Sequence, residues 1–229
     1  MAQFISNSKQ TRILRSNPLS LFVVIIGLVG FISMGCNYVT GLRSAGQPAI
    51  AVAQTDVERK MNPSVSVTDL SRVVTGEQTF AVDLYHRLQQ NQKDNFAYSP
   101  YSISLGIALV YAGARNNTET QIANVLHYPL SQENLHPAFN TLDLELQTYS
   151  ENKEGPEGET GVQLNVVNSI WGQTNYSFSS NYLDTIAKNY GAELKLVNFK
   201  ETPEIARTAI NEWINNQTNG KITNMIPNG

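Results

Sequence analysis

The chain has 229 residues, enough for one large domain or two small ones. Its formal net charge is −3, so it carries no basic field that would attract a nucleic acid, and we expect no nucleic-acid partner. The single cysteine excludes an intramolecular disulfide, and the histidines at 86, 127 and 136 lack metal-ligand spacing, so we expect neither a metal site nor a cofactor.

The first 36 residues have the pattern of an export segment. Lys9, Arg12 and Arg15 form a basic stretch, and residues 19–34 form an apolar run without any charge. The run is longer than a minimal signal core and slightly shorter than the ~20 residues of a full membrane span. Basic residues in front of the run are expected to keep the extreme N-terminus cytoplasmic, and the domain that follows is expected to be exported.

Cys36 follows the small residues Ser33 and Gly35, and this junction resembles a bacterial lipoprotein cleavage site. The resemblance implies lipidation of Cys36 and a lipid-anchored domain. Two alternatives remain open: an uncleaved signal anchor, and ordinary cleavage near residues 51–53. Each of the three makes the protein extracellular or envelope-associated, and the first two attach it to a membrane.

Residues 37–72 are rich in small and polar side chains with little periodicity, which predicts a flexible linker. The globular domain is then expected over residues 73–229. Thr75 and Gln78 have the spacing of a capping box, which predicts that the first helix begins at Thr75 and carries Phe80, Leu84 and Leu88 on its apolar face.

The centre of the chain is predicted to be deeply buried. Residues 95–98 suggest a short strand, Ser99 is a good helix N-cap, and Pro100 suits the first helical turn. The helix over residues 103–114 is apolar almost all round, and such a helix must be buried on all sides. A second capping box over residues 118–121 predicts the next helix.

The remaining elements alternate between helix and strand. Helices are expected over residues 135–149, from 179 to a stop at Gly191, and from Pro203 to a stop at Gly220; strands are expected over 162–170 and 193–199. Helices come first and strands then alternate with helices, which is an α+β pattern.

Several of these segments together resemble the serpins, the fold of serine protease inhibitors and their non-inhibitory relatives. The segments are NFAYSPYSIS at 95–104, AGARNNTETQIANVLHY at 112–128, VNSIWGQ at 167–173, LDTIAKNYGAELKLVNF at 183–199 and INEWINNQTNGKITNMIPNG at 210–229. The resemblance runs from about Thr75 to the last residue and implies the N-terminal portion of a serpin fold. It places the reactive loop beyond Gly229.

The resemblance implies a serine-type endopeptidase inhibitor that acts as a suicide substrate when its reactive loop inserts into the main sheet. Its partner would be a serine or cysteine protease, and a monomer is expected at full length. Ser99, Pro100 and Ser102 correspond to the family's shutter region, which controls sheet opening; their alternative role is simply to cap a helix. A non-inhibitory binding or carrier protein, or an inactive fragment, remains the alternative.

Two functions are not expected. No nucleophile elbow, P-loop, dinucleotide fingerprint or zinc motif occurs, so the chain is not expected to be an enzyme. Heparin binding would need basic residues around residues 131–160, yet this segment holds one lysine, Lys153, against seven acidic residues: Glu133, Asp143, Glu145, Glu151, Glu154, Glu157 and Glu159.

Overall fold

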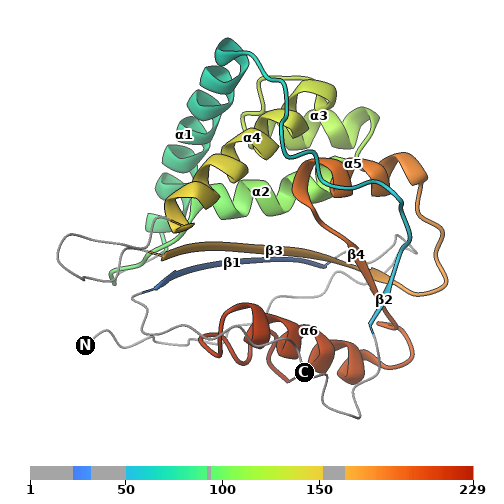
Figure 1. Cartoon of the computed structure of the whole chain (residues 1–229). Helices are drawn as coiled ribbons and strands as arrows, with labels where there is room; N and C mark the ends of the chain where they lie inside the picture. The colour runs from blue at the N-terminus through green and yellow to red at the C-terminus, as the bar shows by residue number, and fades with distance from the viewer. Residues whose placement is uncertain (1–22, 32–49, 92–93, 152–162, 229) are drawn as a thin grey trace.

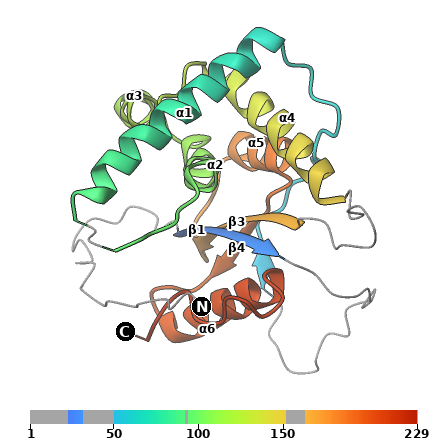
Figure 2. The same ribbon diagram turned by 90° about the vertical axis from the view of Figure 1, so that its left-hand side faces the viewer.

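The structure is a computed structural model that describes residues 23–31, 50–91, 94–151 and 163–228. A four-stranded sheet forms the middle layer. Figure 1 shows α2 and α5 over one face of the sheet, with α1 and α3 beyond them, and α6 alone over the opposite face. Helix α4 runs from the outer layer down to β3. The view turned by 90° in Figure 2 shows the same three layers. The mixture of helices and sheet agrees with the predicted α+β class.

The strand order in the sheet is β1-β3-β4-β2. The long strand β3 (Gln163–Gln173) pairs antiparallel with β1 (Val23–Phe31) and parallel with β4 (Leu194–Val197). Parallel neighbours need a crossover connection, which is supplied by helix α5 (Ser180–Tyr190). The two-residue strand β2 (Ala51–Val52) pairs antiparallel with the outer side of β4.

The buried central helix is confirmed. Helix α2 (Pro100–Tyr111) has no exposed residue; Ser102, Ser104 and Ala108 are completely buried. The helix lies between the sheet and helices α1 and α4, which explains why it lacks a polar face. On the opposite face of the sheet, Trp171 packs with Ile210 and Ile214 of α6 (Pro203–Gln217).

The start of the first helix differs from the prediction. Helix α1 covers Val67–Gln89 and is capped by Ser66, whose hydroxyl accepts a hydrogen bond from the backbone N–H of Asp69 at 3.0 Å. Thr75 lies inside the helix, where its hydroxyl donates to the carbonyl oxygen of Ser71. The predicted start was wrong because Ser66 and Asp69 supply an earlier cap, and the helix then continues through Thr75 without interruption.

The other predicted elements are largely confirmed. Helix α3 (Asn116–Val125) begins two residues before Thr118, and α4 (Gln132–Glu151) contains the predicted 135–149 helix. Helix α5 ends at Gly191, which has the left-handed φ of 58° that favours glycine. Residues 95–98, predicted as a strand, form none in the described structure, because no described strand lies beside them to complete a ladder.

The expected export segment falls mostly outside the described residues, and so does Cys36. Of residues 1–36 the structure describes only Val23–Phe31, which form β1 along the edge of β3. Among the described helices, none has both the length and the apolar content needed to cross a bilayer.

Candidate functional site

The predicted shutter residues lie together at the start of α2, the helix that packs against the sheet. Ser99 is the N-cap: its hydroxyl oxygen accepts from the N–H of Ser102 at 3.2 Å and donates to the hydroxyl of Ser102 at 3.0 Å. Pro100 occupies the first helical turn, where its missing N–H costs nothing. The structure therefore brings Ser99, Pro100 and Ser102 into one hydrogen-bonded turn, with Ser102 completely buried.

A second polar cluster lies one turn further along α2. The hydroxyl of Ser104 lies 2.6 Å from Oε1 of Glu77 and 3.2 Å from the hydroxyl of Tyr128, which itself donates to the carbonyl oxygen of Ser104 at 2.8 Å. Burial raises the pKa of Glu77 to about 7, and the hydrogen bond from Ser104 opposes that shift. The second carboxylate oxygen, Oε2, has no partner among the described residues. The cluster thus contains a carboxyl group that titrates near neutral pH.

Burial also determines the protonation of the neighbouring tyrosines. It raises the pKa of Tyr128, with the Ser104 hydrogen bond acting in the opposite direction, and it raises the pKa of Tyr101, helped by Asp143 and Glu77. Both phenols therefore stay protonated at neutral pH. The hydroxyl of Tyr101 is buried without a partner in the described structure.

Sequence reasoning missed an ordered segment that leads into this domain. Residues 50–60, which we call the N-terminal strap, were predicted to belong to a flexible linker over 37–72. Instead β2 pairs with β4, the N–H of Ala53 donates to the carbonyl oxygen of Leu194 at 2.9 Å, and Thr55 donates to Oδ1 of Asp184 at 2.6 Å. The linker prediction is wrong for residues 50–72, since 67–72 belong to α1.

Arg59 fastens the end of the strap to helix α4. Its Nη2 lies 2.7 Å from Oδ2 of Asp143, and its Nε donates to Oδ1 of Asn140 at 2.9 Å. Asn140 in turn donates to the carbonyl oxygen of Lys60 at 2.6 Å, and the N–H of Lys60 donates to the carbonyl oxygen of Lys188 on α5 at 2.9 Å. The only sequence signal was one arginine in a small-residue segment, which by itself does not indicate a buried contact.

His127 and the acidic residue Asp143 have ordinary ion-pair partners. Nε2 of His127 lies 2.8 Å from Oδ2 of Asp83, so Asp83 pairs with His127 and not with His86 of its own helix. No group of three potential metal ligands occurs in the described part of the chain. Asp143, counted among the acidic residues that oppose heparin binding, is held by Arg59; the absence of heparin binding stays a prediction.

Comparison with known proteins identifies the family. Residues 75–228 match the family model described as "Serpin (serine protease inhibitor)". Leukocyte elastase inhibitor of Equus caballus is 34% identical over 161 residues, covering 70% of this chain and 40% of the horse protein. A serpin-like protein of Methanosarcina acetivorans is 32% identical over 160 residues, covering 69% of this chain and 36% of that protein.

Solved structures support the fold. Maspin superposes with a TM-score of 0.59 at 23% identity, over 70% of this chain and 40% of maspin. Ovalbumin from emu (Dromaius novaehollandiae) gives a TM-score of 0.58 at 26% identity, over 69% of this chain and 42% of ovalbumin. The chain spans about 40% of the length of these relatives. From the family match and the fold together, the chain belongs to the serpin family and contains its N-terminal portion.

Proposed function

We propose that the complete protein inhibits a serine protease by insertion of a reactive loop into the main sheet. Serpins are protease inhibitors and not catalysts, so the chain is not an enzyme. The observation that carries the proposal is the 34% identity to a protein named leukocyte elastase inhibitor over 161 residues. A serine protease is the first partner to test, and a cysteine protease the second.

The geometry of the sheet suits a mechanism of strand addition. Serpin reactive loops are inserted as an extra strand into the main sheet, and backbone hydrogen bonds supply the driving contacts. In this chain, β3 pairs antiparallel with β1 over nine consecutive residues, Val23–Phe31, so this edge of β3 can accept an added strand. If the export segment is cleaved or held in a membrane, as proposed below, these residues leave the sheet and the edge of β3 becomes free for another strand. The turn that joins the partly buried Ser99 to the completely buried Ser102 lies at the start of the helix that packs against β3, which is where a shutter would act.

We further propose that the protein is exported and held at a membrane through its N-terminus, by lipid on Cys36 or by an uncleaved signal anchor. With the export segment in the membrane or cleaved, the described domain resumes at residue 50, so a tether from Cys36 has only residues 37–49 available. Fully extended, this length of chain spans at most about 50 Å. The domain would therefore act close to the membrane surface, against proteases that reach the cell envelope.

A non-inhibitory binding or carrier protein is the second candidate, and an inactive truncated product the third. The fold similarity to emu ovalbumin keeps the second candidate open, because it rests on the same N-terminal portion. The reactive loop decides between these functions. This chain matches only 40% of the length of the horse leukocyte elastase inhibitor, so the comparison does not reach that loop.

The decisive experiment mixes the purified complete protein with pancreatic elastase or trypsin and examines the products by denaturing gel electrophoresis. Inhibition through an acyl-enzyme predicts a covalent complex that survives denaturation. The matched control is the same protease with its catalytic serine blocked, which must give no such complex. Cleavage of the protein without any complex would support the non-inhibitory candidate, and an intact mass that ends at residue 229 would support the truncated product.

A further inference from the structure

The hydrophobic core on the helical side of the sheet is divided into two clusters. One cluster joins α1, α2 and α4, with Leu135 and Phe139 as the members from α4 that are completely buried. The other joins α5 and β4 to β3 and includes Ile186 and Leu194, and α2 contributes to both. Helices α4 and α5 therefore belong to different clusters, and packed layers slide past each other along boundaries of this kind.

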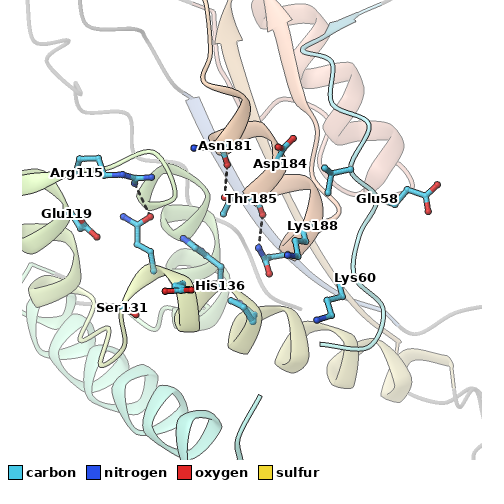
Figure 3. A pocket seen from close by; sticks show the side chains of 15 residues that line it. Glu58, Lys60, Arg115, Glu119, Ser131, His136, Asn181, Asp184, Thr185 and Lys188 are labelled. Carbon is cyan, nitrogen blue, oxygen red and sulfur yellow. Dashed lines mark hydrogen bonds between the residues drawn. The ribbon is translucent and has the colours of Figure 1, made fainter. Parts of the chain in front are cut away.

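The boundary between α4 and α5 is incompletely packed. The two helices meet where Nδ1 of His136 lies 2.5 Å from the hydroxyl oxygen of Tyr190, whose ring packs against both clusters. Beside this contact lies an open cleft of about 990 Å³, with walls from the strap and from α3, α4 and α5. Figure 3 shows His136 in the middle of the lining and Lys60 of the strap on the same side as Lys188 of α5. Space that side chains do not fill supplies no contacts to hold the two helices together.

The strap is bonded to elements on both sides of this boundary. On one side, β2 pairs with β4, and the hydroxyl of Thr55 donates to Asp184 of α5. On the other side, Arg59 pairs with Asp143 of α4. Lys60 serves both sides, because its N–H donates to α5 and its carbonyl oxygen accepts from α4. The strap precedes residues 75–228, which match the serpin family model, so this bridge lies outside the matched region.

A strand added to the sheet would strain the bridge. Neighbouring strands lie about 4.8 Å apart, so an inserted strand displaces the sheet on one side of it by about that distance. Strand β4 is joined to β3 by four residue pairs and moves with it, as does the crossover helix α5, while α4 shares its core with α1 and α2. The bonds of the strap are 2.6–2.9 Å long, and a shift of several ångströms breaks such bonds.

We propose that the strap is a clasp on sheet opening: β4 and α5 separate from α4 only when the bonds of the strap on one side of the boundary are broken. The consequence for inhibition rests on the loop insertion proposed above, whereas the clasp itself is a property of the domain. A weakened clasp should let the boundary open more often and should therefore speed up insertion.

The clasp is tested by hydrogen exchange of the intact protein at pH 7, with Thr55→Val compared with the parent protein. Valine keeps the branched shape of threonine and removes the hydroxyl that donates to Asp184. We expect the backbone amides of β4 and α5 to exchange about fivefold faster, which corresponds to one hydrogen bond of about 1 kcal/mol, while those of α1 keep their rates.

Thr185→Val is the matched control, because its hydroxyl donates within α5 to the carbonyl oxygen of Asn181 and does not cross the boundary. The control should leave the exchange of β4 unchanged. Unchanged exchange of β4 and α5 in Thr55→Val, or an equal rise in both variants, would overturn the clasp.

The protease reaction gives the second readout. The covalent complex of the complete protein with pancreatic elastase should form about fivefold faster for Thr55→Val than for the parent protein or Thr185→Val. Faster exchange with an unchanged rate of complex formation would mean that the strap does not limit insertion. If none of the three proteins forms a complex, the proposed inhibition is wrong, and hydrogen exchange still decides whether the strap is a clasp.

Discussion

Arg59 and Asp143 form an ion pair of 2.7 Å, although 84 residues separate them in the sequence. Their side chains are only 16% and 14% exposed, so water screens the pair weakly. The side chain of Arg59 also fills the space above Gly191, where an added Cβ would come within 2.9 Å of its Cδ. Through this one residue the strap contacts both α4 and the end of α5, and it is therefore part of the folded domain.

Replacing Arg59 with methionine should strongly destabilise the domain. Methionine keeps much of the volume but leaves the largely buried carboxylate of Asp143 with only the hydrogen bond that Gln147 donates, so the loss should approach the lower end of the about 3–5 kcal/mol that breaking a buried pair costs. The measurement is the free energy of unfolding from urea denaturation of the intact protein. Arg87→Met, at an exposed position of α1, is the control and should change stability by less than about 0.5 kcal/mol.

The double variant Arg59→Met with Asp143→Asn tests the cause of that loss. With the charge of Asp143 removed, most of the stability should return, because a carboxylate that has lost its cationic partner is the main penalty. If the double variant loses as much free energy of unfolding as the two single variants together, the ion pair does not hold the strap in place.

Glu77 should make the domain less stable as the pH rises. Its folded pKa is about 7 and its ordinary value is 4.5, so the folded state binds the proton more tightly. The stabilisation is fully present below pH 4.5 and is lost as the pH rises to about 7, a change of roughly 3 kcal/mol. Glu77→Gln removes this titrating group. The free energy of unfolding of the variant should therefore lack the loss that Glu77 causes between pH 4.5 and 7. A slope unchanged in the variant would contradict the assignment.

His136 should act in the opposite direction. Its folded pKa of about 4 lies below the ordinary 6.5, so the unfolded state binds the proton more tightly. Its contribution is present above pH 6.5 and is lost as the pH falls to about 4, again by roughly 3 kcal/mol. His136→Phe should lose this acid sensitivity and keep only the opposite slope of Glu77, so urea denaturation should find the variant more stable at pH 4.5 than at pH 7, a larger difference than the parent protein shows.

The two titrations overlap between pH 4.5 and 6.5, where they oppose each other. The parent protein should therefore show little pH dependence from this pair, while each single variant exposes the slope of the other group. Opposite slopes in Glu77→Gln and His136→Phe are the expected signature.

Ser99→Ala should cost about 1 kcal/mol of stability, because it removes the acceptor for the N–H of Ser102 at the start of α2. Ser66→Ala at the cap of α1 is the comparison, with the same chemistry at an exposed turn. If Ser99 also controls sheet opening, Ser99→Ala should change the yield of covalent protease complex while Ser66→Ala leaves it unchanged.

The sequence predicted the elements whose signals are local. The apolar run of α2, the stop at Gly191 and the start at Pro203 each depend on neighbouring residues, and each lies where it was predicted. The predicted start of α1 was wrong because Ser66 and Thr75 are two competing N-cap signals in the same stretch of sequence. The choice of Ser66 depends on how the helix packs against the rest of the domain, which helix propensity alone does not record.

The strap and the cleft could not be predicted in this way. Small residues such as Ala51 and Val52 become a strand only because β4 offers them an open edge. Similarly, His136 looks like any histidine on a helix until α5 brings Tyr190 against it across 54 residues. Both features arise from contacts between distant segments, which composition and periodicity do not record.

Strand β2 also has a consequence for self-association. The outer edge of β4 would otherwise present unpaired backbone groups, and such an edge is a template on which a second molecule can add its own strand. Pairing with residues 51–52, followed by the bond from Ala53 to Leu194, occupies most of this short edge. A molecule whose chain is cut before α1 would lose that cover, so proteolysis of the strap is expected to convert a protected sheet into one prone to edge-to-edge aggregation.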